Sequence, residues 1–369
     1  MSALRERLRR WRDRVVADPG FQRFALKNPF LRPIARRQAR AMLDLCAGFV
    51  YSQALFACVK LQLFEALRDG PLGVEELSAR LSFAPDATRR LLGAAESLSL
   101  VERRGAQSYG LGLLGAALLG SAAARALIAH QPLFYADLAD PIALLRGEAE
   151  TALSRYWPYS ASDRPKDLKA EDVAPYSALM GASQPLWAQE ALGVYDMCKH
   201  RRLLDVGGGE GAFLIEVAKQ APGLELMLFD LPAVAERARS QLGAAGLSAR
   251  AQVFEGDFLR DPLPRGADVI SLVRIVHDHD DESALKLLRN VRAALSVGGT
   301  LLVIEAIAGT KGFEPLAAYY GFYTLAMGRG EPRTFAQISE LLQTAGFARP
   351  RLLETLLPAT TSVIVAHAI

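Results

Sequence analysis

Cysteine is scarce in this sequence, and long apolar runs are missing. The three cysteines, Cys46, Cys58 and Cys198, are an odd number without CxxC spacing, which argues against a disulfide framework or a zinc site and fits a reducing cytoplasm. The longest uncharged apolar run, residues 45–59, is shorter than the roughly 20 residues of a membrane helix, and residues 1–14 lack the apolar core of a signal peptide. We therefore expect a cytoplasmic protein that does not span a bilayer.

The net charge is small, at +3, but it is unevenly distributed along the chain. Residues 1–40 hold twelve Lys or Arg against three Asp or Glu, so this basic arm carries +9 and the remaining chain −6. Leu4, Leu8, Trp11 and Val15 recur among the arginines at helical spacing. A basic segment with an apolar side is typical of a peripheral contact with the inner face of a membrane. The alternative is a solvated arm that packs on a partner subunit.

Residues 41–120 indicate a small domain that is all-helical apart from a two-stranded wing. Apolar residues are so dense over 41–67 that this helix is expected to be buried against its own and another chain. Short helices over 73–81 and 86–98 precede a hairpin over 100–111, which is the winged-helix order. A ligand-sensing, DNA-binding regulator is the alternative, but the second helix offers only Arg89 and Arg90 to a DNA groove. We therefore interpret this domain as the dimerisation domain of a homodimer, without a nucleic-acid partner.

Residues 121–200 are expected to be helical and to contribute to a substrate pocket. Pro158, Pro165 and Pro175 mark the polar segment 154–175 as a loop over or beside that pocket. Aromatic residues are frequent here, and most of them should belong to the core. A minority is expected to line a large apolar cavity.

Residues 202–230 organise the rest of the chain. A short apolar strand ends at Asp205 and Val206, a turn follows with glycines at 207–209 and 211, and a helix over 212–220 leads to a second strand that ends at Asp230. Such a β-α-β unit with a glycine-rich first turn is typical of nucleotide-containing ligands. Asp230 is placed to accept hydrogen bonds from a ribose diol. A purely structural glycine turn is the alternative.

A dinucleotide is a common ligand of such a turn, but two carboxylates argue against it. A dinucleotide site holds a pyrophosphate at the helix N-terminus, whereas Glu210 lies inside this turn and Asp205 just before it. A ligand with a ribose, an ammonium and a sulfonium but no phosphate fits better. S-adenosylmethionine is such a ligand.

Strands and helices alternate to the C-terminus and predict an α/β, doubly wound, Rossmann-like sheet over residues 201–369. Strands are expected over 251–258, 267–275 and 300–306, helices over 282–296 and 334–345, and two more strands over 351–366. Ligands of such sheets lie at the carboxyl ends of the strands. Five ionisable residues fall at or near those ends: Asp205, Asp230, Asp257, His277 and Glu305.

His277 is the candidate general base. It follows a buried strand, and Glu305, at the end of the next strand, is placed to hold its tautomer. A structural, hydrogen-bonding histidine is the alternative. The cluster over 277–281 also resembles a metal site, but consecutive residues after a strand diverge too much to share one ion, so no metal is predicted.

These segments together resemble the dimeric small-molecule O-methyltransferases, the family of the plant caffeate and acetylserotonin enzymes. The matching segments are LLDVGGGEG (203–211), LFDLP (228–232), EGDFL (255–259), HD (277–278) and Gly298-Gly299 before LLVIEA. With the winged helix, the resemblance covers roughly residues 40–369. It implies a homodimer that uses S-adenosylmethionine.

The resemblance also implies roles for individual residues. His277 would be the base, with Glu305 as its orienting acid and Asp278 beside it. Asp230 would bind the ribose, Asp257 with Phe258 the adenine, and Met180 would flank the reacting methyl. The full set of cofactor-binding candidates is Asp205, Gly207, Gly209, Asp230, Leu231, Gly256, Asp257, Phe258, Arg274, Met180 and Ser183.

The sequence departs from the family pattern in three places. The family's His-Asp-Trp is His277-Asp278-His279 here, and its lysine four residues before the histidine is Val273, with Arg274 one place later. The late Glu-Arg-Thr motif appears as EPRT over 331–334. The role of Glu331 as the family's second catalytic acid is therefore open.

A closer resemblance is to the hydroxyneurosporene and demethylspheroidene O-methyltransferases of purple phototrophic bacteria. It rests on the basic arm (WRDRVVADPGFQRFA, NPFLRPIARRQAR) and on CAGFVYSQALFACVKLQLFEAL, VRIVHDHDDE and YYGFYTLAMGRGEPRT. It implies methylation of the 1-hydroxyl of an acyclic carotenoid, with a phenol or a tetrapyrrole precursor as the alternative substrate. Because a carotenoid resides in the bilayer, the basic arm would bring the pocket to the membrane surface.

Overall fold

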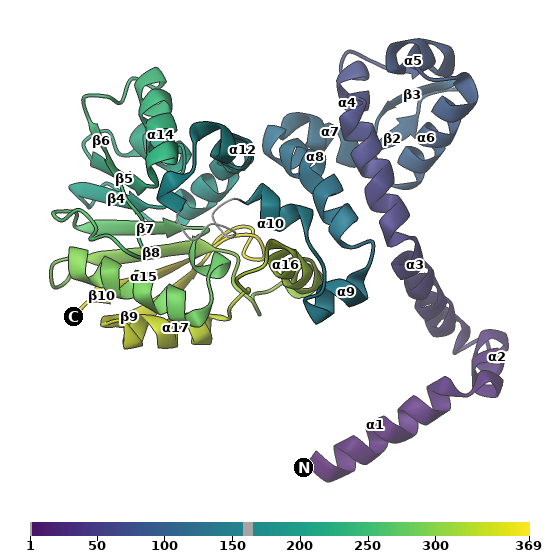
Figure 1. Cartoon of the computed structure of the whole chain (residues 1–369). Helices are drawn as coiled ribbons and strands as arrows, with labels where there is room; N and C mark the ends of the chain where they lie inside the picture. The colour runs from purple at the N-terminus through teal and green to yellow at the C-terminus, as the bar shows by residue number, and fades with distance from the viewer. Residues whose placement is uncertain (1, 158–164) are drawn as a thin grey trace. The chain divides into compact units, whose positions relative to one another are not determined.

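The computed structural model describes residues 2–157 and 165–369, and the chain divides into two compact units, residues 1–119 and 120–369. The first unit contains α1 Ser2–Ala17, α2 Pro19–Lys27, α3 Arg32–Lys60, α4 Leu63–Ala66, β1 Leu72–Gly73, α5 Val74–Leu81, α6 Pro85–Ser97, β2 Val101–Arg103, β3 Ser108–Leu111 and α7 Leu113–Gly120 (Figure 1). The second unit begins with α8 Ala122–Asp137, α9 Pro141–Arg146, α10 Ala152–Tyr156, the 3-10 helix η1 Pro165–Asp167 and α12 Ala170–Val194. It continues with β4 Arg202–Val206, α13 Ala212–Gln220, β5 Glu225–Asp230, α14 Pro232–Ala244, β6 Ala251–Glu255, β7 Val269–Val273, η2 Val276–Asp278, α15 Asp281–Ala294, β8 Thr300–Glu305, α16 Glu314–Met327, α17 Phe335–Thr344, β9 Phe347–Glu354 and β10 Ser362–Ala368.

The predicted winged helix is present in the first unit. Its helices α5 and α6 are followed by the hairpin β2–β3, and a third short strand, β1, completes a sheet of order β1-β3-β2. Phe64, Leu77 and Leu92 are fully buried and form its core. A Cβ at Gly115 would lie 2.0 Å from the backbone oxygen of Leu100, so only glycine lets α7 approach the wing.

Helix α3 differs from the expectation for residues 41–67. It begins at Arg32, with Pro33 in its first turn, and only Cys58 and Val59 of its 29 residues are buried in the single chain. Leu45 is 81% and Phe49 70% exposed. Because the helix continues well before the uncharged run, α3 is long and apolar enough to cross a membrane by length and composition alone. The prediction that no segment is long enough to span a bilayer, which was based on the run 45–59, is therefore wrong.

The second unit is built on a seven-stranded sheet of order β6-β5-β4-β7-β8-β10-β9 (Figure 1). Neighbouring strands from β6 to β8 are parallel, and β10 is antiparallel to β8 and β9. Apolar side chains of α15 and α17 cover one face, and those of α12, α13 and α14 cover the other. The doubly wound prediction is confirmed. Its direction of winding changes between β4 and β7, where such sheets bind ligands.

Two parts of this unit were not predicted correctly. The segment 154–175 is not one loop, because α10 extends to Tyr156 and α12 begins at Ala170, with Pro175 inside the helix. The Tyr156 hydroxyl donates a hydrogen bond to the Pro175 carbonyl at 2.7 Å. The predicted loop residues Pro158 and Tyr159 lie outside the described residues. Helix α16 has apolar and aromatic residues on all sides and was not predicted.

Candidate active site

The glycine turn between β4 and α13 forms the floor of a cavity. Gly207 and Gly209 have φ angles of 69° and 57°, which side chains other than glycine rarely adopt. The Gly209 N–H donates to Asp230 Oδ2 at 2.8 Å, and the Leu231 N–H donates to Asp230 Oδ1 at 2.7 Å. Each carboxylate oxygen has a second lone pair. Asp230 can therefore accept further hydrogen bonds from a diol in the cavity.

Asp205 is buried directly beneath this turn. Its Oδ1 accepts a hydrogen bond from the Ser271 hydroxyl at 2.6 Å, while its Oδ2 has no hydrogen-bond partner among the described residues. Burial raises the pKa of Asp205 to about 7, against the effect of the Ser271 hydrogen bond. Burial also raises the pKa of Asp230 to about 6, against its two backbone hydrogen bonds. Such an arrangement favours a ligand with positive charge and hydrogen-bond donors.

The cavity itself has a volume of about 230 Å³ and lies within the second unit. The predicted site residues that line it are Gly207, Gly209, Asp230, Leu231, Asp257, Phe258, Arg274, Asp278 and Met180. Two aromatic residues of the region 121–200, Trp157 and Tyr176, also line it, as expected for a minority of them. Lining residues that were not predicted include Gln184, His279 and Arg329. Strand ends, α12 and the segment after β7 thus meet around one space.

Five predicted site residues do not line the cavity: Asp205, Ser183, Gly256, His277 and Glu305. Ser183 acts through Arg274, whose Nη1 donates to its hydroxyl at 2.9 Å. Gly256 allows a close approach, because a Cβ there would lie 2.5 Å from the Phe229 ring. These two residues shape the site from outside it.

Arg274 is held in the cavity by an unusual set of contacts. Its φ angle is 59°, and its guanidinium lies 4.2 Å from the ring centroid of Trp187, a cation–π contact. Ser183 and Trp187 carry no negative charge, and no ion pair of Arg274 occurs among the described residues. The guanidinium is therefore suited to bind a carboxylate.

His277 lies between two carboxylates. Its Nδ1 is 2.9 Å from Glu305 Oε2, and its Nε2 is 3.2 Å from Asp278 Oδ1. Glu305 also accepts a hydrogen bond from the His277 backbone N–H at 3.1 Å. Burial lowers the pKa of His277, but Asp278 and Glu305 outweigh it and raise the pKa to about 10. His277 reaches the cavity through Asp278 and does not face it directly.

The charge of Glu210 differs from the expectation. Glu210 does not act as a free negative charge, because Arg237 of α14 donates to its Oε1 at 2.7 Å. The pair neutralises the charge that was expected to repel a pyrophosphate. The acidic character of the site comes from Asp205 and Asp230.

Comparison with known proteins identifies the family. Residues 135–348 match the model of the O-methyltransferase domain, and residues 43–121 match that of the O-methyltransferase dimerisation domain. The chain belongs to the O-methyltransferase family.

The sequences and structures of several known proteins align with most of this chain. Demethylspheroidene O-methyltransferase of Cereibacter sphaeroides is 43% identical over 96% of this chain and 93% of its own. Acetylserotonin O-methyltransferase of Mus musculus is 32% identical over 86% and 85%. Among solved structures, human N-acetylserotonin methyltransferase in complex with SAM has a TM-score of 0.73 at 26% identity, over 90% of this chain and 97% of that chain. The protein is an S-adenosylmethionine-dependent O-methyltransferase, and its dimerisation domain indicates a homodimer.

The residues of this methyltransferase fit S-adenosylmethionine. The unpartnered Oδ2 of Asp205 and the acceptor positions of Asp230 suit the cofactor's positive charge and ribose diol. Arg274 suits its carboxylate, and the half-buried Phe258 ring lines the cavity where adenine would stack. No group of three or more His, Cys, Asp or Glu side chains able to hold a metal ion occurs in the described part of the methyltransferase.

Two arginines of the methyltransferase contribute to the site through contacts that the sequence did not predict, although Arg333 belongs to the EPRT motif. Arg237 pairs with Glu210, which lies 27 residues earlier in the chain. Arg333 donates a hydrogen bond to the carbonyl of Val276, 57 residues earlier and next to His277. Glu331 does not contact His277. Its side chain is 58% exposed and lies 4.0 Å from the Arg333 guanidinium.

Proposed function

We propose that this methyltransferase methylates a terminal hydroxyl of an acyclic hydroxycarotenoid, with His277 as the general base. The observation that carries the substrate class is the similarity to two demethylspheroidene O-methyltransferases, at 43% and 40% identity over 96% and 92% of this chain. The alternative is a phenolic or tetrapyrrole substrate for the same chemistry.

The geometry supports the role of His277 as a base. Bound S-adenosylmethionine supplies an electrophilic methyl group on a positively charged sulfur. Glu305 accepts from Nδ1, which leaves Nε2 as the position that takes the hydroxyl proton. The Asp278 carboxylate lies next to Nε2 and also lines the cavity. The substrate hydroxyl would take the place of this carboxylate at Nε2. A neighbouring positive charge lowers the pKa of an imidazolium, so the bound cofactor would oppose the effect of Asp278 and Glu305 on the pKa of His277.

Aromatic residues of α16 and α8 form an apolar cluster near His277, although they do not line the cavity. Tyr320 of α16 lies 6.5 Å from the His277 ring, between ring centroids, and stacks on Phe313. Tyr319 and Tyr323 of the same helix pack on Phe134 of α8. Burial raises the pKa of Tyr319 to about 12, which keeps its hydroxyl neutral. The polyene chain would contact this cluster outside the cofactor cavity, which has a volume of about 230 Å³.

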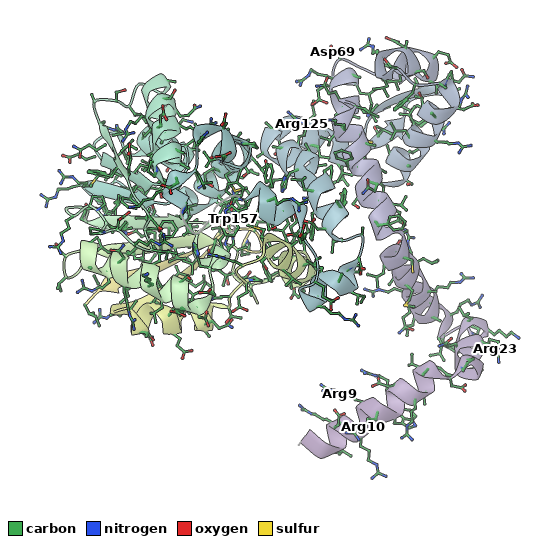
Figure 2. The ribbon with its side chains drawn as sticks, viewed as in Figure 1. Arg9, Arg10, Arg23, Asp69, Arg125 and Trp157 are labelled. Carbon is green, nitrogen blue, oxygen red and sulfur yellow. The ribbon has the colours of Figure 1, made fainter. Side chains whose placement is uncertain are left out.

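We further infer that the protein is cytoplasmic and contacts the membrane surface through its basic arm. The side chains of Leu4, Leu8 and Trp11 on α1 are 69%, 57% and 59% exposed. Arg9, Arg10 and Arg23 extend from the ribbon of α1 and α2 (Figure 2). Apolar and basic side chains on one exposed helix suit an anionic lipid surface.

The substrate is tested by incubation of the purified protein with methyl-labelled S-adenosylmethionine and a panel of hydroxylated carotenoids, phenols and pigment precursors. We expect label on the hydroxyl oxygen of acyclic 1-hydroxycarotenoids. Faster labelling of a phenol, or of a carbon atom, would show that the carotenoid assignment is wrong.

The role of His277 is tested by His277→Ala. Since general bases contribute about 10²- to 10⁴-fold, we expect kcat to fall by at least about 100-fold. Cofactor affinity, measured by calorimetry, should stay nearly intact, because His277 does not line the cavity. Loss of cofactor binding, or retained turnover, would mean that the histidine is structural.

A further inference from the structure

Arg333 is the largest fully buried side chain among the described residues, and all three of its nitrogen groups are used. Its Nη1 donates to the Val276 carbonyl at 2.9 Å, and its Nη2 donates to the His279 carbonyl at 2.7 Å. Its Nε donates to Asp281 Oδ1 at 2.8 Å. The two carbonyls stand immediately before His277 and immediately after Asp278. One planar group thus joins both ends of the turn that carries these two residues.

The segment that carries Arg333 is itself fixed against this turn. A Cβ at Gly330 would lie 2.2 Å from the His277 backbone oxygen, so the two backbones are in direct contact. After Arg333, Ala308 donates its N–H to the Arg333 carbonyl at 2.9 Å, and Thr334 caps helix α17. The backbone of Arg333 is therefore held by the segment that follows β8, and this fixes the position of its guanidinium.

Fold stability alone does not account for a buried arginine with these partners. Burying a guanidinium costs several kcal/mol of desolvation. The acid to which Arg333 is hydrogen-bonded, Asp281, is 70% exposed. An apolar residue would avoid that cost, but it would leave the Val276 and His279 carbonyls without this donor. What an apolar residue lacks is the planar fork that sets two carbonyls at fixed positions.

We propose that Arg333 is a positioning residue of the methyl transfer, which holds the turn 276–279 so that His277 stays between Glu305 and Asp278 beside the cavity. This rests on the proposed role of His277 as base. Arg333 does not line the cavity, so it acts on the reaction through the backbone of His277. A misplacement of about 1 Å at a reacting group can cost about 100-fold in rate.

The test compares Arg333→Gln and Arg333→Lys with the wild-type protein and with Asp281→Asn and His277→Gln. Active sites are counted by titration with S-adenosylmethionine, and kcat, both KM values and Tm are measured for each. We expect Arg333→Gln to lower kcat per active site on the order of 100-fold, with the cofactor KM within about threefold. Arg333→Lys keeps the charge but not the fork, and should lose on the order of tenfold. Asp281→Asn keeps both carbonyl bonds and should remain within about twofold.

The outcomes separate this inference from the proposed function. If His277→Gln retains turnover, the base assignment fails. If His277→Gln is inactive while the folded Arg333 variants keep kcat within twofold of wild type, the positioning role alone is overturned. A lower Tm with unchanged kcat per active site would likewise assign Arg333 a purely structural role. Should Arg333→Gln not fold, Arg333→Lys decides by the same criterion.

Discussion

Asp205 places a carboxylate in a part of the protein that water hardly reaches. Asp205 is 1% exposed, and one of its oxygens has no partner among the described residues. A buried, unpaired carboxylate costs folding free energy whenever it is ionised. A positively charged cofactor in the adjacent cavity would compensate the charge. Asp205 would therefore favour cofactor binding and disfavour folding of the cofactor-free protein.

We therefore predict that Asp205→Asn stabilises the cofactor-free protein at high pH. Burial raises the folded-state pKa of Asp205 to about 7, above its ordinary value of 3.8. The protonated group favours folding below pH 3.8, and this advantage disappears as the pH rises through 7. Compared with wild type, the variant should gain more Tm at pH 8 than at pH 5. Its affinity for S-adenosylmethionine should fall.

Asp69→Asn is the matched control for the loss of one negative charge. Asp69 is exposed and lies in the first unit, so its substitution should change Tm equally at both pH values. An equal change in Tm for Asp205→Asn at pH 5 and pH 8 would contradict the prediction.

At the scale of elements, helix α3 has an apolar face that remains exposed in a single subunit. Leu45 and Phe49 are four residues apart and lie on the same side of the helix. Residues 43–121, which match the dimerisation domain, include both of them. We expect this face to be buried between subunits.

The double substitution Leu45→Glu/Phe49→Glu should therefore convert the dimer to a monomer, because it places four charges in one interface. Size-exclusion chromatography with light scattering measures the mass. Arg37→Glu, on the exposed part of α3 before residue 43, is the control and should remain dimeric. A dimer that survives the double substitution would assign α3 a different role.

At the scale of the whole molecule, the basic arm should determine where the enzyme meets its substrate. Each Lys or Arg near an anionic lipid surface contributes about 1 kcal/mol. We expect the protein to sediment with vesicles that contain phosphatidylglycerol, and not with pure phosphatidylcholine. High salt should weaken this binding.

Arg9→Glu/Arg10→Glu should weaken vesicle binding by at least about tenfold. Arg89→Glu/Arg90→Glu makes the same change of net charge on α6 and should have little effect. Equal losses in both variants would mean that net charge, and not the arm, decides the interaction. If vesicle binding is lost in the monomeric Leu45→Glu/Phe49→Glu variant but kept in Arg9→Glu/Arg10→Glu, the arm packs on the partner subunit.

Local chemistry determined much of this protein from the sequence alone. The turn at 207–211 needs positive φ angles, which glycine supplies, and the strands around it are short apolar runs that end in an acid. The alternation of strands and helices then requires those ends to meet at one edge of a parallel sheet. For this reason the fold and Asp230 could be predicted from the residues, whereas Phe258 and Arg274 were predicted from the resemblance to the family.

Contacts between distant parts of the chain were decided by the tertiary structure. Arg237 neutralises Glu210, Arg333 bonds the backbone beside His277, and Asp278 separates His277 from the cavity. The sequence also did not show that α3 starts at Arg32 or that α16 is a helix. A long cationic side chain has many acceptors within reach, and nothing in its local sequence selects among them. Only the packing of the sheet and its helices brings the selected partner close enough to exclude water and fix the bond.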